Sequence, residues 1–234
     1  MVRLPKLYTL QPVNVFIGHS NKDKQSANNL FLCLQKIVPF VPYMAEYYTN
    51  LGENYKERIM VQLEQSTFIV FLLTESGINS QWVNQEIGYA YALRKKNKGI
   101  PIVIPISRKT LELKGLITKD TDDILFSDDY LDYKWEIYNI ITKIRSRLIK
   151  GFDKGTFRIR VTCTSCHDRK DDLPFEFQED FPSQKTLDRI SIANQHIYTV
   201  SCPQCHTKIP LDIRTWFPIK PEELKSEAEK TSKN

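Results

Sequence analysis

The sequence lacks the features that would identify a membrane or secreted protein. No apolar run approaches the roughly 18 residues that a membrane-spanning helix needs, and the first residues, Met-Val-Arg-Leu-Pro-Lys, contain no secretory signal. We therefore expect a cytoplasmic protein that does not enter a membrane. The sequence also contains neither a G-x-G-x-x-G motif nor a Walker loop, which disfavours ordinary Rossmann and nucleoside-triphosphate chemistry.

The chain also lacks a large excess of one charge sign. It carries 33 Lys and Arg against 28 Asp and Glu, a formal net charge of +5. Residues 1–150 hold 20 basic and 15 acidic residues, whereas residues 151–234 hold 13 of each. A modestly basic first part suits an anionic small molecule, but the charge is too dilute to indicate nucleic-acid binding.

Cysteine is scarce, and four of the five cysteines form two CxxC pairs. Cys33 lies among apolar residues at helical spacing and is expected in the core. The two pairs are 35 residues apart, and each follows a β-like run. In a chain without a secretory signal, this pattern indicates a metal site before disulfides; redox dithiols and unligated cysteines are the alternatives. We predict a tetrahedral structural Zn²⁺ site formed by Cys163, Cys166, Cys202 and Cys205.

The first part of the chain alternates between two hydrophobic periods. The expected strands cover residues 13–17, 38–43, 68–73, 100–106 and 124–126. The expected helices cover residues 22–37, 54–63, 80–96 and 133–149. Strand–helix alternation with near-continuous apolar strands predicts a flavodoxin-like, doubly wound parallel sheet over residues 11–150. Pro42 places the strand at 38–43 near a sheet edge.

The second part reads as a smaller β-rich module. Residues 151–155 are the expected linker, residues 156–218 the expected zinc ribbon, and residues 219–234 the expected flexible tail. Between the CxxC pairs, residues 168–190 are polar and are expected to form an extended loop. Four thiolates on Zn²⁺ add about two negative charges. That charge argues against phosphate-backbone binding and favours a protein partner for the ribbon.

Trp82 and Glu86 form the strongest candidate for chemistry. They are four residues apart, so a helix brings both side chains to one face. They follow the strand at 68–73, and open α/β sheets bind ligands beyond the carboxyl ends of their strands. Considered alone, a glutamate near a helix start is more often a solvated residue, and a tryptophan is more often part of the core.

Three ordered motifs extend this interpretation. They are Val15–Asp23, Pro42–Glu46 with Gly52, and Ser66–Ser76 running into Ser80–Glu86. Over residues 11–148 the chain resembles the TIR family, and within it the prokaryotic antiviral TIR proteins such as those of Thoeris systems. The resemblance implies cleavage of NAD⁺ at the nicotinamide–ribose bond, with Glu86 as the catalytic residue. The products would be nicotinamide and ADP-ribose or a cyclic ADP-ribose isomer, in antiviral signalling.

The implied reaction assigns further residues to substrate binding. A carboxylate can stabilise the oxocarbenium-like ribose that forms as nicotinamide leaves. Trp82 would wall the site, and Phe16 would pack against a base. The loop Gly18-His19-Ser20 would offer backbone N–H groups and a hydroxyl, and Glu46 is a weaker ligand candidate. Ser20 has a second interpretation as the N-cap of the first helix.

Two other functions compete with an enzyme. One is a non-enzymatic scaffold in which TIR domains join through surface loops, and the other is a zinc-ribbon sensor with the TIR unit as its output. TIR domains generally resemble enzymes that become active when they assemble, so the resemblance implies that this chain self-associates through its TIR domain. The sequence does not decide between hydrolysis and cyclisation.

Overall fold

The computed structural model describes residues 12–45, 55–108, 110–113, 115–117, 125–127, 133–148, 157–167, 174–192, 196–220 and 222–224. A five-stranded parallel sheet forms the first half, in the order β3-β1-β4-β5-β6. Its strands are β1 (Val13–Gly18), β3 (Phe40–Tyr43), β4 (Phe68–Leu73), β5 (Ile102–Arg108) and β6 (Leu125–Ser127). The predicted doubly wound sheet is confirmed, and β3, which contains Pro42, is an edge strand as expected.

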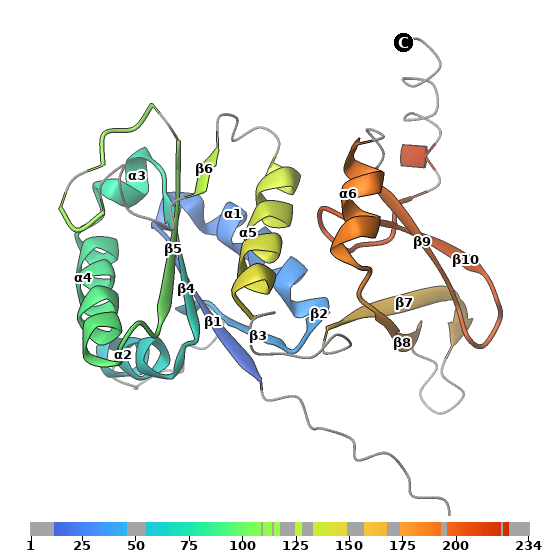
Figure 1. Ribbon diagram of the computed structural model, residues 1–234, viewed down its shortest axis with the longest axis horizontal. Helices are drawn as coiled ribbons and strands as arrows, with labels where there is room; N and C mark the ends of the chain where they lie inside the picture. The colour runs from blue at the N-terminus through green and yellow to red at the C-terminus, as the bar shows by residue number, and fades with distance from the viewer. Residues whose placement is uncertain are drawn as a thin grey trace, which may run out of the picture.

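Helices cover both faces of this sheet (Figure 1). On one face lie α1 (Lys24–Gln35), which follows the short 3₁₀ turn η1 (Asn21–Asp23), and α5 (Tyr133–Leu148). On the other lie α2 (Tyr55–Gln65), the one-turn α3 (Glu75–Ile78) and α4 (Gln81–Lys96). Successive strand residues point to opposite faces. Val15 and Ile17 therefore join the α1/α5 core, while Phe16 joins the α2/α4 core.

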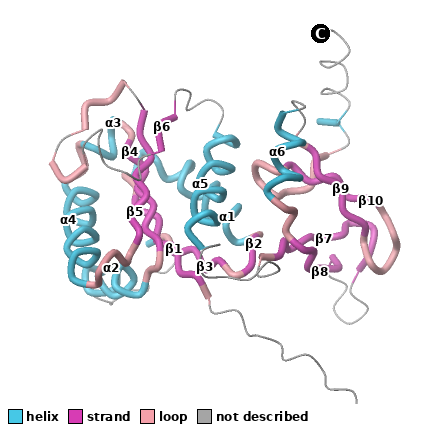
Figure 2. Tube along the Cα trace, in the orientation of Figure 1, coloured by secondary structure: helices cyan, strands magenta, loops and turns pink. Residues whose placement is uncertain are grey.

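The described residues from 157 onward form the ribbon (Figure 2). It contains β7 (Arg158–His167), β8 (Pro174–Asp180), α6 (Gln184–Ile192), β9 (Ile197–Ser201) and β10 (Lys208–Asp212). The prediction of an extended loop at 168–190 is wrong for the residues described there, because they include β8 and most of α6. The polar residues concealed an alternating strand: Phe175 and Phe177 are partly buried, while their neighbours Glu176 and Gln178 are exposed.

A strand pairing joins the ribbon to the first half of the chain. The two-residue strand β2 (Ile37–Val38) pairs antiparallel with β7, placing Ile37 opposite Ile159. The Arg160 backbone N–H donates to the Lys36 carbonyl at 2.8 Å, and Arg160 Nη1 donates to the Gln35 carbonyl at 2.9 Å. The predicted first helix therefore ends earlier than residue 37, because the chain leaves α1 to form this pairing.

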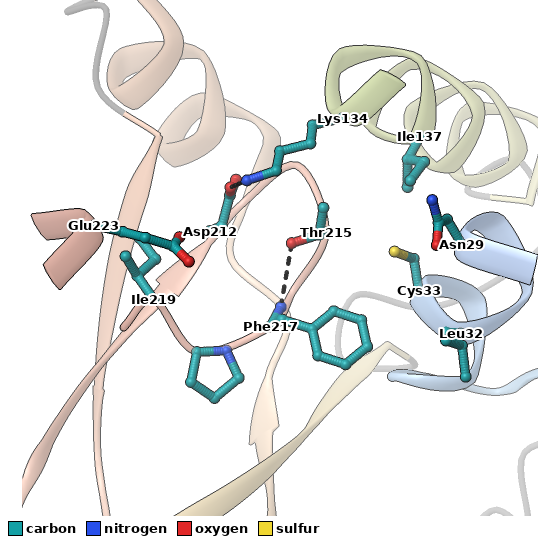
Figure 3. Close-up of a pocket in the computed structure, with 11 residues that line it drawn as sticks. Asn29, Leu32, Cys33, Lys134, Ile137, Asp212, Thr215, Phe217, Ile219 and Glu223 are labelled. Atoms are coloured by element: carbon teal, nitrogen blue, oxygen red, sulfur yellow. Dashed lines mark hydrogen bonds and ion pairs between the residues drawn. The ribbon is translucent and has the colours of Figure 1, made fainter. Parts of the chain in front are cut away.

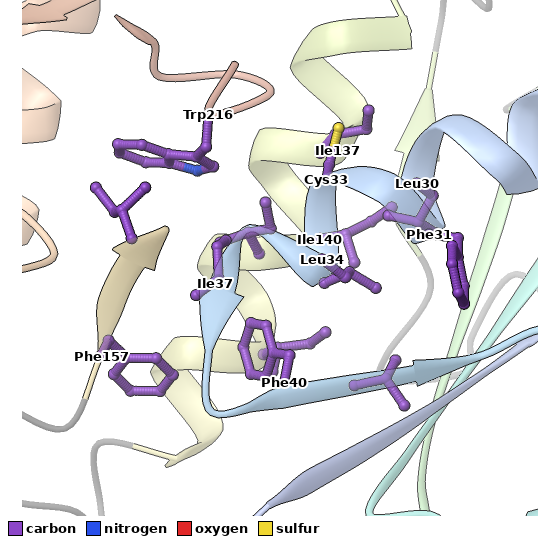
Figure 4. Close-up of a cluster of buried hydrophobic side chains, with 14 of the residues drawn as sticks. Leu30, Phe31, Cys33, Leu34, Ile37, Phe40, Ile137, Ile140, Phe157 and Trp216 are labelled. Carbon is purple, nitrogen blue, oxygen red and sulfur yellow. The ribbon is translucent and has the colours of Figure 1, made fainter. Parts of the chain in front are cut away.

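One hydrophobic core runs through both parts (Figure 4). The Phe40 and Phe157 rings meet edge to face at 5.7 Å, and Phe181 lies 4.4 Å from Trp216 between ring centroids. The Arg145 guanidinium of α5 stands over the ring of Phe181 at 4.1 Å. Burial lowers the pKa of Arg145, yet a cation on an aromatic face retains a favourable contact.

The layers therefore run from α2 and α4 to the sheet, then to α1 and α5, and finally to the ribbon (Figure 1). In the described part of the chain, no helix combines the length and apolar composition needed to cross a bilayer.

Candidate functional site

Glu86 lies one and a half turns into α4, which begins where the preceding segment leaves the carboxyl edge of the sheet. Ser80 is the N-cap, and its Oγ accepts a hydrogen bond from the Val83 backbone N–H at 3.3 Å. This cap fixes where the helix starts, and hence which side chains face inward. Glu86 is only 6% exposed. The alternative of a solvated glutamate at a helix start is therefore wrong.

Gly18, the last residue of β1, allows this carboxylate to approach the sheet. A Cβ atom on Gly18 would lie 2.4 Å from the Phe71 ring and 3.1 Å from Glu86 Oε2. The first distance is closer than packed atoms tolerate, so the position requires glycine. The structure thus brings two of the predicted site residues, Gly18 and Glu86, into contact range at the end of β1.

A cavity of about 240 Å³ opens between α2 and α4 beside this carboxylate. Its lining is formed by Lys56, Ile59, Met60, Leu63, Trp82, Gln85, Glu86 and Tyr89. Trp82 is partly buried there, and its ring lies 5.7 Å from that of Tyr55. The predicted pair Trp82 and Glu86 therefore shares one cavity, with an indole and a carboxylate on a largely apolar wall.

Tyr89 closes one side of the cavity through a hydrogen bond. Its hydroxyl donates to the Glu64 carboxylate of α2, and this bond raises the pKa of Tyr89. The contact joins α2 to α4 across the cavity. It gives Tyr89 a structural role on the cavity wall.

The loop after β1 is organised by a residue that the sequence analysis did not single out. Asp23 is 9% exposed, and its Oδ2 accepts hydrogen bonds from Ser20 Oγ at 2.5 Å and from Thr74 Oγ1 at 2.7 Å. Ser20 occupies the N-cap position of η1, but its side chain makes no capping hydrogen bond. Ser20 is therefore the N-cap residue of this first helical turn by position, while its hydroxyl donates to the Asp23 carboxylate. The spacing Ser20-x-x-Asp23, which is typical of a capping box, is the sequence pattern that could have identified Asp23.

A second hollow, of about 630 Å³, adjoins this loop. It is lined by Ser20, Asn21, Lys22, Glu75, Ser76, Asn79 and Ser80. The nearby His19 side chain places Nδ1 2.8 Å from the Ser20 carbonyl oxygen. The loop after β1 and the turn after β4 thus form the walls of one hollow at the carboxyl edge of the sheet.

One predicted ligand residue, Phe16, is not brought to the cavity. Phe16 is 1% exposed and stacks on Tyr43 with ring centroids 5.7 Å apart, so the structure gives it a packing role in the α2/α4 core. Glu46 lies outside the described residues.

The four predicted metal ligands converge in the ribbon. The Sγ atoms of Cys163, Cys166, Cys202 and Cys205 all lie within 4.8 Å of one another. The shortest distances join the two knuckles, with Cys163 to Cys205 at 3.7 Å and Cys166 to Cys202 at 3.8 Å. A tetrahedral zinc site with Zn–S bonds of about 2.3 Å separates its sulfur atoms by about 3.8 Å. The cluster therefore fits a four-coordinate metal and is too open for disulfide bonds.

Local turns hold the second knuckle in this shape. The Cys202 backbone N–H donates to the Thr207 carbonyl at 3.0 Å, and the His206 N–H donates to the Cys202 carbonyl at 2.9 Å. His206 adopts a φ of 60°, a left-handed conformation that turns the chain back after Cys205. Cys205 is exposed, whereas the other three cysteines are buried. Burial is the main cause that raises the pKa of Cys163, and a bound cation would favour the thiolate form that a metal site uses.

A third cavity lies where the ribbon meets α1 and α5 (Figure 3). It has a volume of about 500 Å³ and includes Cys33, Lys134 and Asp212 in its lining. Asp212 accepts two hydrogen bonds from the Arg214 guanidinium, each 2.8 Å long, and pairs with Lys134 Nζ at 3.3 Å. Burial opposes ionisation of Asp212, but the hydrogen bonds and charges of Arg214 and Lys134 outweigh it and lower its pKa. This ion pair links α5 to the ribbon.

Comparisons with known proteins agree with this architecture. A family model described as TIR domain matches residues 15–141, which is more than half of the chain. No curated protein sequence matches the chain.

Among solved structures, the TIR domain of the Toll-related receptor TRR-2 from Hydra magnipapillata is similar, with 14% identity and a TM-score of 0.41. The match covers 58% of this chain and 98% of that chain. The TIR domains of the activated Roq1 resistosome, which directly recognises the pathogen effector XopQ, are similar with 19% identity and a TM-score of 0.37. That match covers 61% of this chain and 76% of the other.

Proposed function

The chain belongs to the TIR-domain family, and we propose that it is an enzyme that cleaves NAD⁺ at the nicotinamide–ribose bond. The observation that carries this proposal is the position of Glu86: a carboxylate 6% exposed, against Gly18 at the end of β1, and on the wall of a cavity. Some TIR domains are NADases, so the family accommodates this activity.

The chemistry matches a single buried carboxylate. Nicotinamide leaves as a neutral pyridine, so the reaction needs no strong general acid. The barrier lies in the positive charge that develops on the ribose. A preorganised carboxylate in a water-poor site stabilises such a charge far better than one in bulk water. Glu86 is the group that we assign to this role.

The cavity size indicates which part of the dinucleotide it holds. Pockets for drug-sized ligands have volumes of about 300–1,000 Å³, and the cavity at Glu86 is smaller, at about 240 Å³. We assign it to the nicotinamide and its ribose, with Trp82 against the flat ring. Lys56 on the lining supplies a positive charge for the pyrophosphate. The loop Gly18-His19-Ser20, of which Ser20 lines the hollow of about 630 Å³, is assigned to the rest of the substrate.

Hydrolysis and cyclisation share this first step. The product then depends on whether water or a second hydroxyl of the nucleotide attacks the ribose, giving ADP-ribose or a cyclic isomer. From the resemblance to prokaryotic antiviral TIR proteins, we propose that this activity serves defence signalling.

The test is nicotinamide release from NAD⁺ by purified protein over a range of protein concentrations. We expect release by the wild type and a loss of at least about 100-fold in Glu86→Gln, as when a charge-stabilising group is removed. Glu176→Gln is the matched control, because Glu176 is an exposed glutamate of β8 in the ribbon and outside the cavity lining. Turnover by Glu86→Gln at the wild-type rate, or no turnover by concentrated wild type, would leave the non-enzymatic scaffold as the better account.

We assign Zn²⁺ to the four cysteines as a structural metal. Four protein ligands complete a tetrahedral shell and leave no open position for a substrate. Zinc would stabilise the ribbon, because three of these cysteines belong to the hydrophobic core that the ribbon shares with α1 and α5. We expect stoichiometric zinc that is lost in Cys163→Ser/Cys166→Ser and retained in Cys33→Ser. Freshly purified wild type without zinc would contradict the assignment.

We propose that a second copy of the chain binds the exposed surface of α2. TIR domains self-associate, and α2 exposes Tyr55, Met60 and Val61, at 42–45%. These apolar side chains lie on a helix that forms one wall of the cavity, so a second copy bound there would support that wall. Specific activity that rises with protein concentration is the expected result, and a constant value would contradict it. The ribbon pairs with the TIR part of its own chain through β7 and β2, and a separate protein partner for the ribbon stays a prediction.

A further inference from the structure

We infer that Asp23 is a positioning residue for Glu86, and this inference rests on the function proposed above. Asp23 does not line the cavity at Glu86. It ties together two segments at the carboxyl edge of the sheet, and the shape of the Glu86 site depends on both.

Asp23 connects the two segments through a network of hydrogen bonds between residues that are far apart in sequence. Asp23 Oδ2 accepts from the hydroxyl of Ser20 at 2.5 Å and from that of Thr74 at 2.7 Å. Thr74 Oγ1 in turn accepts from the Gly77 backbone N–H at 2.9 Å, which fixes its proton towards Asp23. The carboxylate therefore links the loop after β1 to the N-cap of α3 after β4.

Both linked segments act on Glu86. Ser20 is two residues beyond Gly18, and the Glu86 carboxylate lies against Gly18. Thr74 caps α3, which leads directly to Ser80, the cap of the helix that carries Glu86. Moving the first segment alters the surface that the carboxylate touches. Moving the second alters the start of α4, so the distance between carboxylate and substrate depends on the bond network at Asp23.

The charge of Asp23 matters as well as its shape. Hydrogen bonds to an ionised acceptor are roughly twice as strong as those between neutral groups. In Asp23→Asn the amide oxygen can accept the same two hydroxyls more weakly. In Asp23→Ala both hydroxyls lose their acceptor inside a buried loop. The two variants should therefore loosen the site to different degrees.

The experiment measures kcat and KM for nicotinamide release, with Asp188→Ala as the control. Asp188 is an exposed aspartate of α6 in the ribbon. A displacement of about 1 Å near the chemistry can cost about 100-fold in rate, so we expect Asp23→Ala to lower kcat by about 10- to 100-fold. Asp23→Asn should fall between Asp23→Ala and wild type. The fall in kcat should exceed any rise in KM, because Asp23 acts mainly on the reacting geometry, although the loop that it holds through Ser20 is also assigned to substrate binding.

A second readout keeps this inference separate from the proposed function. The ¹³Cδ resonance of Glu86 reports the surroundings of its carboxylate, and amide hydrogen exchange of segments 18–23 and 74–79 reports the tie itself. We expect Asp23→Ala to shift the resonance and to speed exchange in both segments together, while Asp188→Ala does neither.

Each outcome has one meaning. If wild type does not release nicotinamide, the proposed function fails, and the resonance and exchange still decide whether Asp23 positions Glu86. The positioning inference is overturned if wild type is active and Asp23→Ala has the wild-type kcat at temperatures below its own melting temperature. It is also overturned if Asp23→Ala leaves the Glu86 resonance unshifted.

Discussion

Ile159→Ala tests whether the ribbon and the TIR domain unfold as one unit. Ile159 is a ribbon residue that is 0% exposed, and it pairs with Ile37 of the first half in the β2–β7 register. Truncating a buried isoleucine to alanine costs about 2–5 kcal/mol. A loss of about 3 kcal/mol lowers the melting temperature of a chain of this size by about 6–12 °C. If the core is shared, this change must destabilise the parallel sheet although the altered residue lies in the ribbon.

The assay is thermal unfolding followed by hydrogen exchange of peptides from β4 and from β9. We expect one transition, shifted equally at both places. Ile192→Ala is the matched control, because Ile192 is 85% exposed in the same ribbon, and an exposed truncation changes stability by less than about 0.5 kcal/mol. Two separate transitions, with β4 unshifted in Ile159→Ala, would refute the shared core.

Three further predictions follow from individual contacts. Gly18→Ala should lower nicotinamide release and reduce the free energy of unfolding by about 1–3 kcal/mol, because its Cβ would meet Phe71 and Glu86. Turnover and thermal melting measure the two effects. An active and equally stable variant would contradict the close approach of Glu86 to Gly18. Asp212→Asn should be less stable than wild type at neutral pH, because the pKa of Asp212 is lowered in the fold. That contribution is present above the ordinary value of 3.8 and is lost as the pH falls through the lower folded value, so urea titrations of the two proteins should converge in acid. Burial raises the pKa of Cys33 to about 12, so iodoacetamide at pH 8 should leave Cys33 unmodified in folded protein, and rapid alkylation would contradict its burial.

The sequence predicted the sheet and the site where local signals were strong. The strand at 68–73 and the helix from 81 to 96 were recognisable because one is a continuous apolar run and the other has a clear cap. The metal cluster was predictable because two CxxC pairs carry their own spacing rule. The catalytic role expected for Glu86 came from the family resemblance alone, and its burial was not predicted, since a helical glutamate gives no local sign of where its carboxylate points.

What the sequence did not predict depends on contacts distant along the chain. The short strand β2 has two residues and no periodicity, and its existence depends on Ile159, far away in sequence. β8 was hidden because polar residues occupy its exposed positions. Asp23 could be placed at a turn, but its bond to Thr74 crosses 51 residues, and no local pattern reports such a partner.

The most direct measurement of the central claim is a crystal structure of Glu86→Gln with NAD⁺ bound. We expect the nicotinamide to lie against Trp82 in the cavity between α2 and α4. We also expect the ribose C1′ to lie about 3–3.5 Å from the side chain of residue 86, the spacing of a near-attack geometry. NAD⁺ seated away from this cavity, or no bound NAD⁺ at concentrations that wild type turns over, would contradict the central claim.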